Sequence, residues 1–472
     1  MAAYVPSGEN PGTVLILITA AFTGTDPAVA RRSAKENGIA PARRDRGIMI
    51  STASRGPETL SLQQQAFDSS GLGSEVRQSD FRKYRQVLSK ATKDQLVADA
   101  VASAANTFNG TCGLRYTRKG SRYICVIDSY PKTLVLRKIA ANLSSITMTR
   151  PSERSRLIKV LLLFLTQEIQ FRLYRFDVRR FFDSLSVQGS LAHVADSAVS
   201  RKTVELLAAV LREHTAAGKP GIPTGLAISA ALAELMMDPF DQYVRSLPGV
   251  FYLGRFVDDI VVITCGEEDV SEFERGLLAA LPPGTSFGAK KQDRVDAPRV
   301  DHGSSVEIGR FDYLGYEFKI RDERVRSKES KRVVDVDLSE RSVKRLLTRT
   351  AKAFRAYASD GRFDELYLRI CYLTSNYRLF DPLVNRKRLA GVYHNHPFLT
   401  YHPGNSLQEL DGALRRLVFD SPNTRAGAGV QLNAQQRRML AARSFVQGHM
   451  RKQYRAFDIK TLALIKRCWL DG

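Results

Sequence analysis

Two adjacent acids, Asp258 and Asp259, lie inside the apolar stretch Phe251-Tyr-Leu-Gly-Arg-Phe-Val-Asp-Asp-Ile-Val-Val-Ile263. This pattern predicts a strand, a turn and a second strand. Two carboxylates held together in low-dielectric surroundings are costly unless a cation compensates them, which favours a divalent metal site. The alternative is that the pair only fills a two-residue hairpin turn, which acids tolerate well. Both interpretations can hold, because a tight hairpin is a way to present two acids to a metal.

A third acid ends another short apolar run. Asp177 closes a segment typical of a strand, and Phe181-Phe-Asp183 opens the helix that we expect next. Phosphoryl transfer uses carboxylates from separate strands to hold two ions roughly 3.5–4 Å apart. Asp177, Asp258 and Asp259 supply that set, and the backbone carbonyl of Val178 would add a ligand. We expect two Mg²⁺ ions, with Mn²⁺ as the alternative.

A loop that contains glycine and proline separates the two acid segments. It reads Pro220-Gly-Ile-Pro-Thr-Gly-Leu226 and leads into an amphipathic helix that extends to about residue 244. Glycine lets the backbone approach a base pair or a triphosphate closely, and a helix start favours anions. The alternative is a core helix after an ordinary loop. The position between the two acid segments favours a functional role.

Four motifs occur in an order that resembles the palm of reverse transcriptases, over residues 170–320. They are Phe176-Asp-Val-Arg-Arg-Phe-Phe-Asp183, Gly221-Ile-Pro-Thr-Gly-Leu-Ala-Ile-Ser229, Arg255-Phe-Val-Asp-Asp259 and Phe311-Asp-Tyr-Leu-Gly-Tyr-Glu-Phe318. Within that superfamily the chain resembles bacterial retron, group II intron and defence-associated enzymes. It is most similar to the b-subunit lineage of the type-three antiviral systems, which pair two reverse transcriptases with a non-coding RNA.

The resemblance implies an α+β fold of the right-hand polymerase type. We expect fingers at residues 79–170, a palm with an antiparallel sheet at 171–320, and a primer-grip continuation, helical thumb and basic C-terminal helical region at 321–472. Pro, Gly, Ser and Arg recur in residues 1–78, which are therefore interpreted as a poorly ordered or weakly structured extension. Its apolar patch at 13–22 is too short to span a bilayer. The sequence leaves open whether translation starts at Met1 or Met49.

The resemblance also implies roles for individual residues. Phe182, five residues after Asp177, falls where the family places the steric gate against a ribose 2′-hydroxyl. Lys291 falls near the lysine that assists the leaving pyrophosphate, with the adjacent Lys290 as the alternative. Further nucleotide contacts are implied for Arg137, Lys138, Thr224 and Gly225, and the primer grip for Tyr313, Leu314, Gly315 and Tyr316.

Thr224 is a departure from the family pattern. Many reverse transcriptases carry a glutamine at this place in the loop, where its amide contacts the incoming nucleotide. A threonine hydroxyl is shorter and cannot offer both an amide donor and an amide acceptor. We therefore expect nucleotide contacts to differ here, while the metal chemistry is unaffected.

The composition favours a polyanionic partner. The chain of 472 residues holds 71 Lys and Arg against 49 Asp and Glu, a net charge of +22. This excess predicts salt-sensitive nucleic-acid binding, although an RNA-associated structural protein would share it. The five cysteines lack paired spacing and indicate reduced thiols in a bacterial cytoplasm. His394, His396 and His402 are interpreted as turn and surface residues.

Two classes of function remain. The first is a reverse-transcriptase-type DNA polymerase that transfers nucleotides from dNTPs to a primer or protein hydroxyl, on an RNA template or beside a non-coding RNA, in antiphage defence. It would make a DNA product, with a second reverse transcriptase as a possible partner and no membrane. The second is a scaffold that keeps the polymerase fold to bind RNA or a partner. The three acids favour the first, with a group II intron or retron enzyme as a further alternative.

Overall fold

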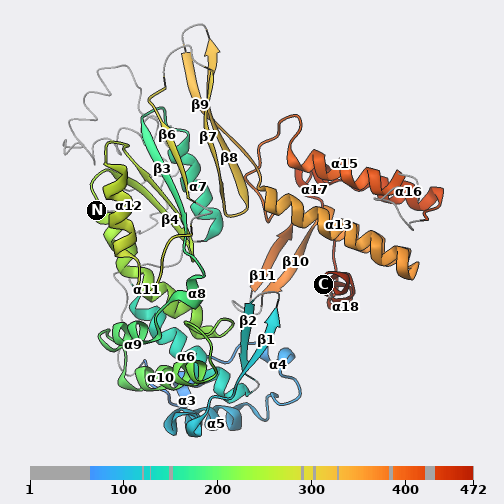
Figure 1. Cartoon of the computed structure of the whole chain (residues 1–472). Coiled ribbons are helices and arrows are strands. Elements are labelled where there is room, and N and C mark those ends of the chain that lie inside the picture. Colours follow the sequence, from blue (N-terminus) through green and yellow to red (C-terminus); the bar gives the residue numbers. More distant parts are fainter. Residues whose placement is uncertain are drawn as a thin grey trace, which may run out of the picture. The chain divides into compact units, whose positions relative to one another are not determined.

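The computed structural model describes residues 64–119, 122–127, 129–147, 153–288, 292–300, 305–326, 329–381, 386–419 and 431–470. Residues 59–472 form one compact unit, and all statements below concern its described part (Figure 1). Residues 1–63 of the expected N-terminal extension, including the apolar patch, lie outside the described residues. In the rest of that extension, α3 (Ser69–Gly73) begins after Asp68, whose side chain accepts from the N–H of Gly71.

Helices and one hairpin lie between α3 and the central sheet. They are α4 (Asp80–Lys83), α5 (Lys93–Ala105), the short 3-10 helix η1 (Thr107–Gly110), β1 (Leu114–Lys119), β2 (Arg122–Ile127), α6 (Tyr130–Ile146) and α7 (Arg154–Leu165). At the start of α6, Ser129 accepts from the N–H of Lys132 and Pro131 lies in the first turn, both of which favour helix initiation. The buried residues of α6 pack against α5.

The central sheet is antiparallel, with strand order β4-β5-β3-β6. Its strands are β3 (Phe171–Asp177), β4 (Val250–Phe256), β5 (Asp259–Thr264) and β6 (Asp293–Ala297). Side chains alternate between two cores, as the period of a strand requires. Tyr174 and Phe176 belong to one core, whereas Leu173, Val261 and Ile263 belong to the other. The prediction that these apolar runs form strands is therefore confirmed, and the strands are buried on both faces.

Helices connect these strands and cover one face of the sheet (Figure 1). They are α8 (Phe181–Ser184), α9 (Val187–Ala195), α10 (Arg201–Ala216), α11 (Ala227–Ser246) and α12 (Val270–Ala280). The helix predicted after the loop at 220–226 is confirmed as α11. It buries Ile228, Leu232 and Phe240 completely and contacts α6 and β4.

A second antiparallel sheet, β7-β8-β9, packs into the core on the other face, together with α7. Its strands are β7 (Val306–Tyr313), β8 (Tyr316–Arg326) and β9 (Glu329–Leu338). Leu314 and Gly315 form the two-residue turn between the paired residues Tyr313 and Tyr316. Both turn residues have positive φ, at 48° and 80°, as in a type I′ hairpin turn.

The C-terminal region is helical except for one hairpin. Its elements are α13 (Glu340–Asp360), α14 (Phe363–Thr374), β10 (Asn376–Asp381), β11 (Arg386–Gly391), α15 (Ser406–Phe419), α16 (Ala434–Ala441), α17 (Phe445–Met450) and α18 (Ile459–Leu470). The hairpin β10–β11 was not predicted, and its Tyr377 ring stacks on Tyr372 of α14 with centroids 4.4 Å apart. The expected α+β class with an antiparallel sheet is confirmed. Among the described residues, every helix is too short or too polar to cross a membrane.

Candidate active site

The three acids predicted from the sequence come together at one end of the central sheet. Asp177 on β3 is the register partner of Asp259 on β5. Asp258 precedes Asp259 in the β4–β5 turn, and its carbonyl accepts from the N–H of Val178 at 3.0 Å. Val178 itself is buried and bridges to Phe287. Acids that lie far apart in the sequence therefore meet at one end of the central sheet.

The β4–β5 turn has an unusual backbone. Phe256 pairs with Asp259, which leaves Val257 and Asp258 as a two-residue loop. Val257 has φ of +61°, a region that β-branched residues rarely adopt and that glycine usually fills in such hairpins. Conformations of this kind cost about 1–3 kcal/mol and persist only where the surroundings hold them. The two interpretations of the sequence thus both apply, because the β4–β5 connection is a tight hairpin turn and also carries the acids.

The side chain of Arg255 stabilises the β4–β5 turn. Its guanidinium donates to the carbonyl of Val257 at 3.3 Å and to both carboxylate oxygens of Asp241 at 2.8 Å. A second carboxylate, that of Glu234, accepts from the same guanidinium at 2.7 Å. Arg255 is only 8% exposed, so these contacts tie β4 to α11 through a buried ion-pair network.

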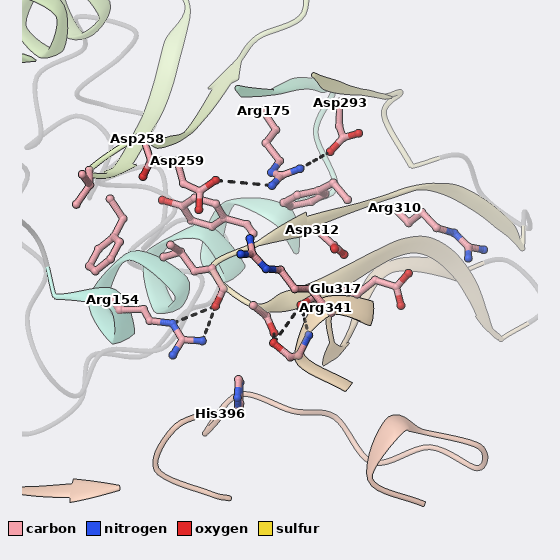
Figure 2. A pocket seen from close by; sticks show the side chains of 18 of the residues that line it. Arg154, Arg175, Asp258, Asp259, Asp293, Arg310, Asp312, Glu317, Arg341 and His396 are labelled. Atoms are coloured by element: carbon pink, nitrogen blue, oxygen red, sulfur yellow. Dashed lines mark hydrogen bonds and ion pairs between the residues drawn. The ribbon is translucent and has the colours of Figure 1, made fainter. Parts of the chain in front are cut away.

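Arg175 places a positive charge among the acids. It lies two residues before Asp177, on the same face of β3. Its guanidinium lies 3.7 Å from Asp259 and 2.8 Å from Asp293 on β6 (Figure 2). Arg175 therefore links the ends of three strands and offsets part of the repulsion between their carboxylates.

The donor set suits divalent ions. Asp177, Asp258 and Asp259 offer hard carboxylate oxygens from two neighbouring strands and the turn beside them, which is the chemistry that Mg²⁺ and Mn²⁺ prefer. Within the described ranges, no three His, Cys, Asp or Glu side chains are yet drawn together at metal-ligand spacing. The fit therefore rests on the ligand chemistry and the strand register alone.

A pocket of about 740 Å³ opens beside the acids. Asp258 and Asp259 line it (Figure 2). The β7–β8 turn at Leu314 and Gly315 also lines it. The turn is fixed by Arg154, whose Nε donates to the carbonyl of Leu314 at 3.0 Å. The site is thus a polar cleft between the central sheet and the β7–β8 hairpin.

The sequence of residues 140–318 matches the family described as reverse transcriptase (RNA-dependent DNA polymerase). The chain contains a reverse transcriptase domain. No curated protein matches the sequence. One similar solved structure is the apo telomerase from Candida tropicalis truncated from its C-terminal domain, with 14% identity and a TM-score of 0.31. The alignment covers 48% of this chain and 55% of the telomerase chain, so it spans about half of each.

Within the reverse transcriptase domain, Phe182 lies close to the loop at 220–226. Phe181 is 3% exposed and belongs to the core, whereas Phe182 is half-buried and packs at its edge. The carbonyl of Phe182 accepts from the N–H of Ile222 at 2.9 Å. A Cβ atom on Gly221 would lie 2.1 Å from that carbonyl, so only glycine fits there. The role of Phe182 as a steric gate stays a prediction, and the half-buried position of its ring is compatible with that role.

Thr224 is bound to the β1–β2 hairpin. Its hydroxyl donates to the carbonyl of Tyr123 at 2.6 Å, and its own carbonyl accepts from the N–H of Cys125 at 2.7 Å. Gly225 has φ of +101°, and a Cβ atom there would lie 2.6 Å from Ile124. The hydroxyl of Thr224 therefore serves the contact between loop and hairpin, and altered nucleotide handling at this position stays a prediction.

The remaining residues predicted to contact the nucleotide or the primer differ in where the structure places them. Arg137 forms a buried ion pair with Asp80 at 2.6 Å, and Lys138 donates to the carbonyl of Gln64 at 2.6 Å. Both cations bind protein groups, so a nucleotide contact would require them to leave these partners. Lys290 and Lys291 lie outside the described residues. In the predicted primer grip, the rings of Tyr313 and Tyr316 are buried, and only the turn between them projects.

The sequence alone missed several residues of the pocket. Arg175 was detectable, because strand alternation places it on the face of Asp177. Arg341 and Arg345 lie on α13, and no local pattern links them to the acids. His396 was interpreted as a turn and surface residue, and the surface part is wrong: it is 6% exposed and lines the pocket. Its burial comes from long-range packing on Tyr316, which a single sequence does not reveal.

Proposed function

We propose that the chain is a DNA polymerase of the reverse-transcriptase type. A primer or protein hydroxyl attacks the α-phosphate of a dNTP, a new P–O bond forms, and the bond to the β-phosphate oxygen breaks to release pyrophosphate. The observation that carries the proposal is the pairing of Asp177 with Asp259, beside Asp258, inside the matched reverse transcriptase domain. A protein that only binds RNA gains nothing from three acids in mutual repulsion.

The chain's own residues position the reactants. Asp177, Asp258 and Asp259, with the carbonyl of Val178, would hold divalent ions, which when bound stabilise negative charge at the reacting oxygens and the phosphate. Arg255 keeps the β4–β5 turn in its strained form, so that Asp258 and Asp259 project from the sheet end. Phe182 would exclude a 2′-hydroxyl by filling the space beside the sugar. Positioning and charge are what this type of transfer requires from a protein.

The test is incorporation of an α-phosphate-labelled dNTP into acid-insoluble product, with primed RNA, primed DNA and no added nucleic acid compared. Asp258→Ala should abolish incorporation in a protein that folds normally. The matched control is Asp296→Asn, an exposed acid at the other end of β6. Incorporation by folded Asp258→Ala at the wild-type rate would refute the catalytic proposal. Nucleic-acid binding by a wild-type protein that incorporates nothing would instead indicate a scaffold.

We further propose that the enzyme acts in antiphage defence in the bacterial cytoplasm, with a non-coding RNA and a second reverse transcriptase as partners. The support is the resemblance of the motifs to the b-subunit lineage of two-polymerase systems, together with the net charge of +22. The expected result is phage protection by the wild-type gene in its genomic setting and loss of protection with Asp258→Ala. Equal protection by both genes would refute the link between polymerisation and defence.

A further inference from the structure

The last turn of α10 meets the β1–β2 hairpin and the loop at 220–226 in one place. His214 lies in this turn, and it is only 4% exposed. Its Nδ1 atom lies 2.9 Å from the hydroxyl of Tyr116 on β1, and its Nε2 atom lies 3.3 Å from the carbonyl of Pro220, the first residue of the loop. One buried side chain therefore joins the hairpin to the loop.

Chemistry fixes the directions of these two hydrogen bonds. The carbonyl of Pro220 can only accept, so Nε2 carries a hydrogen. Burial lowers the pKa of His214 from its usual 6.5, although the hydrogen bond to Pro220 and the charge of Asp183 act in the opposite direction, and the ring is therefore neutral at neutral pH. In a neutral ring with its hydrogen on Nε2, the Nδ1 atom is an acceptor. The hydroxyl of Tyr116 must then donate to it.

Cys125 extends this chain across the hairpin. It is the register partner of Tyr116, and its thiol hydrogen-bonds to the tyrosine hydroxyl. Burial raises the pKa of the Cys125 thiol to about 11, so the thiol keeps its hydrogen at neutral pH. Because Tyr116 gives its own hydrogen to His214, its oxygen can accept from the thiol. The thiol, the hydroxyl and the imidazole thus donate in sequence, and the chain ends at the carbonyl of Pro220.

The other end of the loop is held by the same cysteine. The backbone N–H of Cys125 donates to the carbonyl of Thr224 at 2.7 Å. Just before the loop, Lys219 places its ammonium group 3.7 Å from the centroid of the Tyr123 ring, which adds a cation–π contact to the hairpin. Cys125 therefore reaches Thr224 through its backbone and Pro220 through Tyr116 and His214. We call this arrangement of Cys125, Tyr116 and His214 the loop clamp.

We infer that the three residues of the loop clamp are positioning residues for the incoming nucleotide, because they fix both ends of the loop that packs on Phe182. The inference rests on the proposed function, since the loop meets a dNTP only in a polymerase. None of the three lines the pocket beside the acids, so they act on the nucleotide through the loop. Buried hydrogen bonds in a chain strengthen one another, so the loss of one member should loosen the whole clamp.

Steady-state incorporation separates nucleotide affinity from the chemical step. His214→Phe keeps a ring in the buried site and removes both hydrogen bonds. It should raise the KM for dNTP about tenfold and leave kcat within about twofold, the pattern of a contact shared by ground state and transition state. The amide of His214→Gln can still donate to Pro220, so this variant should recover most of the affinity. A merely structural role would lower kcat through loss of folded protein and leave KM unchanged.

Further variants test whether the clamp acts as a unit. Tyr116→Phe should raise the KM about fivefold and Cys125→Ala about twofold. Adding Tyr116→Phe to His214→Phe should not raise the KM further, because both groups belong to one chain. His193→Gln is the matched control, at a partly exposed histidine on the neighbouring helix α9, and it should match the wild type. If His214→Phe does not fold, His214→Gln and Tyr116→Phe carry the same test.

Hydrogen exchange measured by mass spectrometry tests the clamp without nucleotide incorporation. In His214→Phe, peptides that cover residues 220–226 and 122–127 should exchange about tenfold faster, while peptides from β3 and β5 should match the wild type. Unchanged exchange in both peptides, or an unchanged KM in a folded His214→Phe protein, would overturn the inference.

A wild-type protein that incorporates nothing would refute the polymerase proposal by itself. The inference is then decided by titrating dNTP with Mg²⁺ and following the exchange of the peptide that covers residues 220–226. Protection by dNTP in the wild type that needs about tenfold more dNTP in His214→Phe supports the inference. No protection in the wild type, or equal protection in the two proteins, overturns it.

Discussion

Asp177 on β3 faces Asp259 on β5 across the antiparallel register of the central sheet. Like charges in directly opposed strand positions destabilise a sheet, by a few tenths of a kcal/mol to about 1 kcal/mol. Arg175 offsets part of this repulsion through its ion pair with Asp259. We therefore predict that Asp177→Asn leaves the free energy of unfolding unchanged or raises it by up to about 1 kcal/mol, as measured by urea titration. A clear loss of stability would show that Asp177 has a structural role.

Arg255 should be essential to the fold around the catalytic turn. Arg255→Gln leaves Asp241 buried without its bidentate partner, and removing one member of a buried ion pair typically costs about 3–5 kcal/mol. Urea unfolding should show a loss of this size, together with reduced nucleotide incorporation. Arg245→Gln is the matched control, because Arg245 is largely exposed and lies 3.9 Å from the same Asp241. Its loss should be about 0–1 kcal/mol. Equal effects of the two changes would contradict the account of the network.

Phe182 and Phe181 should separate substrate selection from packing. Phe182→Ala opens space beside the sugar, so the ratio of ribonucleotide to deoxynucleotide incorporation should rise while the protein stays folded. Phe181→Ala removes a core ring and should cost about 3–5 kcal/mol of stability. Single-nucleotide extension with dNTPs and NTPs checks the first change, and thermal unfolding checks the second. An unchanged nucleotide ratio in Phe182→Ala would show that its ring only packs.

Acid pH should destabilise the protein through His396. Burial, and then the charges of Arg154, Arg345 and His449, lower its pKa from the usual 6.5 to about 3. Between those pH values the unfolded chain binds a proton that the folded protein does not, so stability is lost as pH falls from 6.5 towards 3. His396 would contribute on the order of 4 kcal/mol to that loss.

Urea titrations at several pH values test this contribution. His396→Phe should show a shallower loss of stability between pH 6.5 and 3 than the wild type, although His214 and His449, whose pKa values burial also lowers, act in both proteins. His402→Phe, at a partly exposed position, should follow the wild type. Identical pH profiles for the wild type and His396→Phe would contradict the burial of this ring.

The sequence predicted those strands, turns and helices that are controlled by local sequence pattern. The apolar runs predicted that Asp177 ends one strand and that Asp258 and Asp259 lie at a hairpin turn. That the three acids meet was predicted from the needs of phosphoryl transfer and from the order of the motifs, and the register of β3 with β5 brings Asp177 opposite Asp259. His396 escaped prediction because its position depends on packing against Tyr316, which is far away in the sequence. The β10–β11 hairpin escaped because Tyr377 is stabilised by stacking on another element. The buried pairing of Arg137 with Asp80 likewise depends on a distant partner that no motif announces.

The most direct test of the central claim is nucleotide incorporation by Asp177→Asn, Asp259→Asn and the double variant, with Asp296→Asn as the control. If the two acids act in one centre, each single change should lower the rate by a factor of at least about a thousand, and the double variant should be no slower than the singles. Asp296→Asn should match the wild type. Wild-type rates in either single variant, or losses that multiply in the double variant, would contradict a shared nucleotidyl-transfer centre.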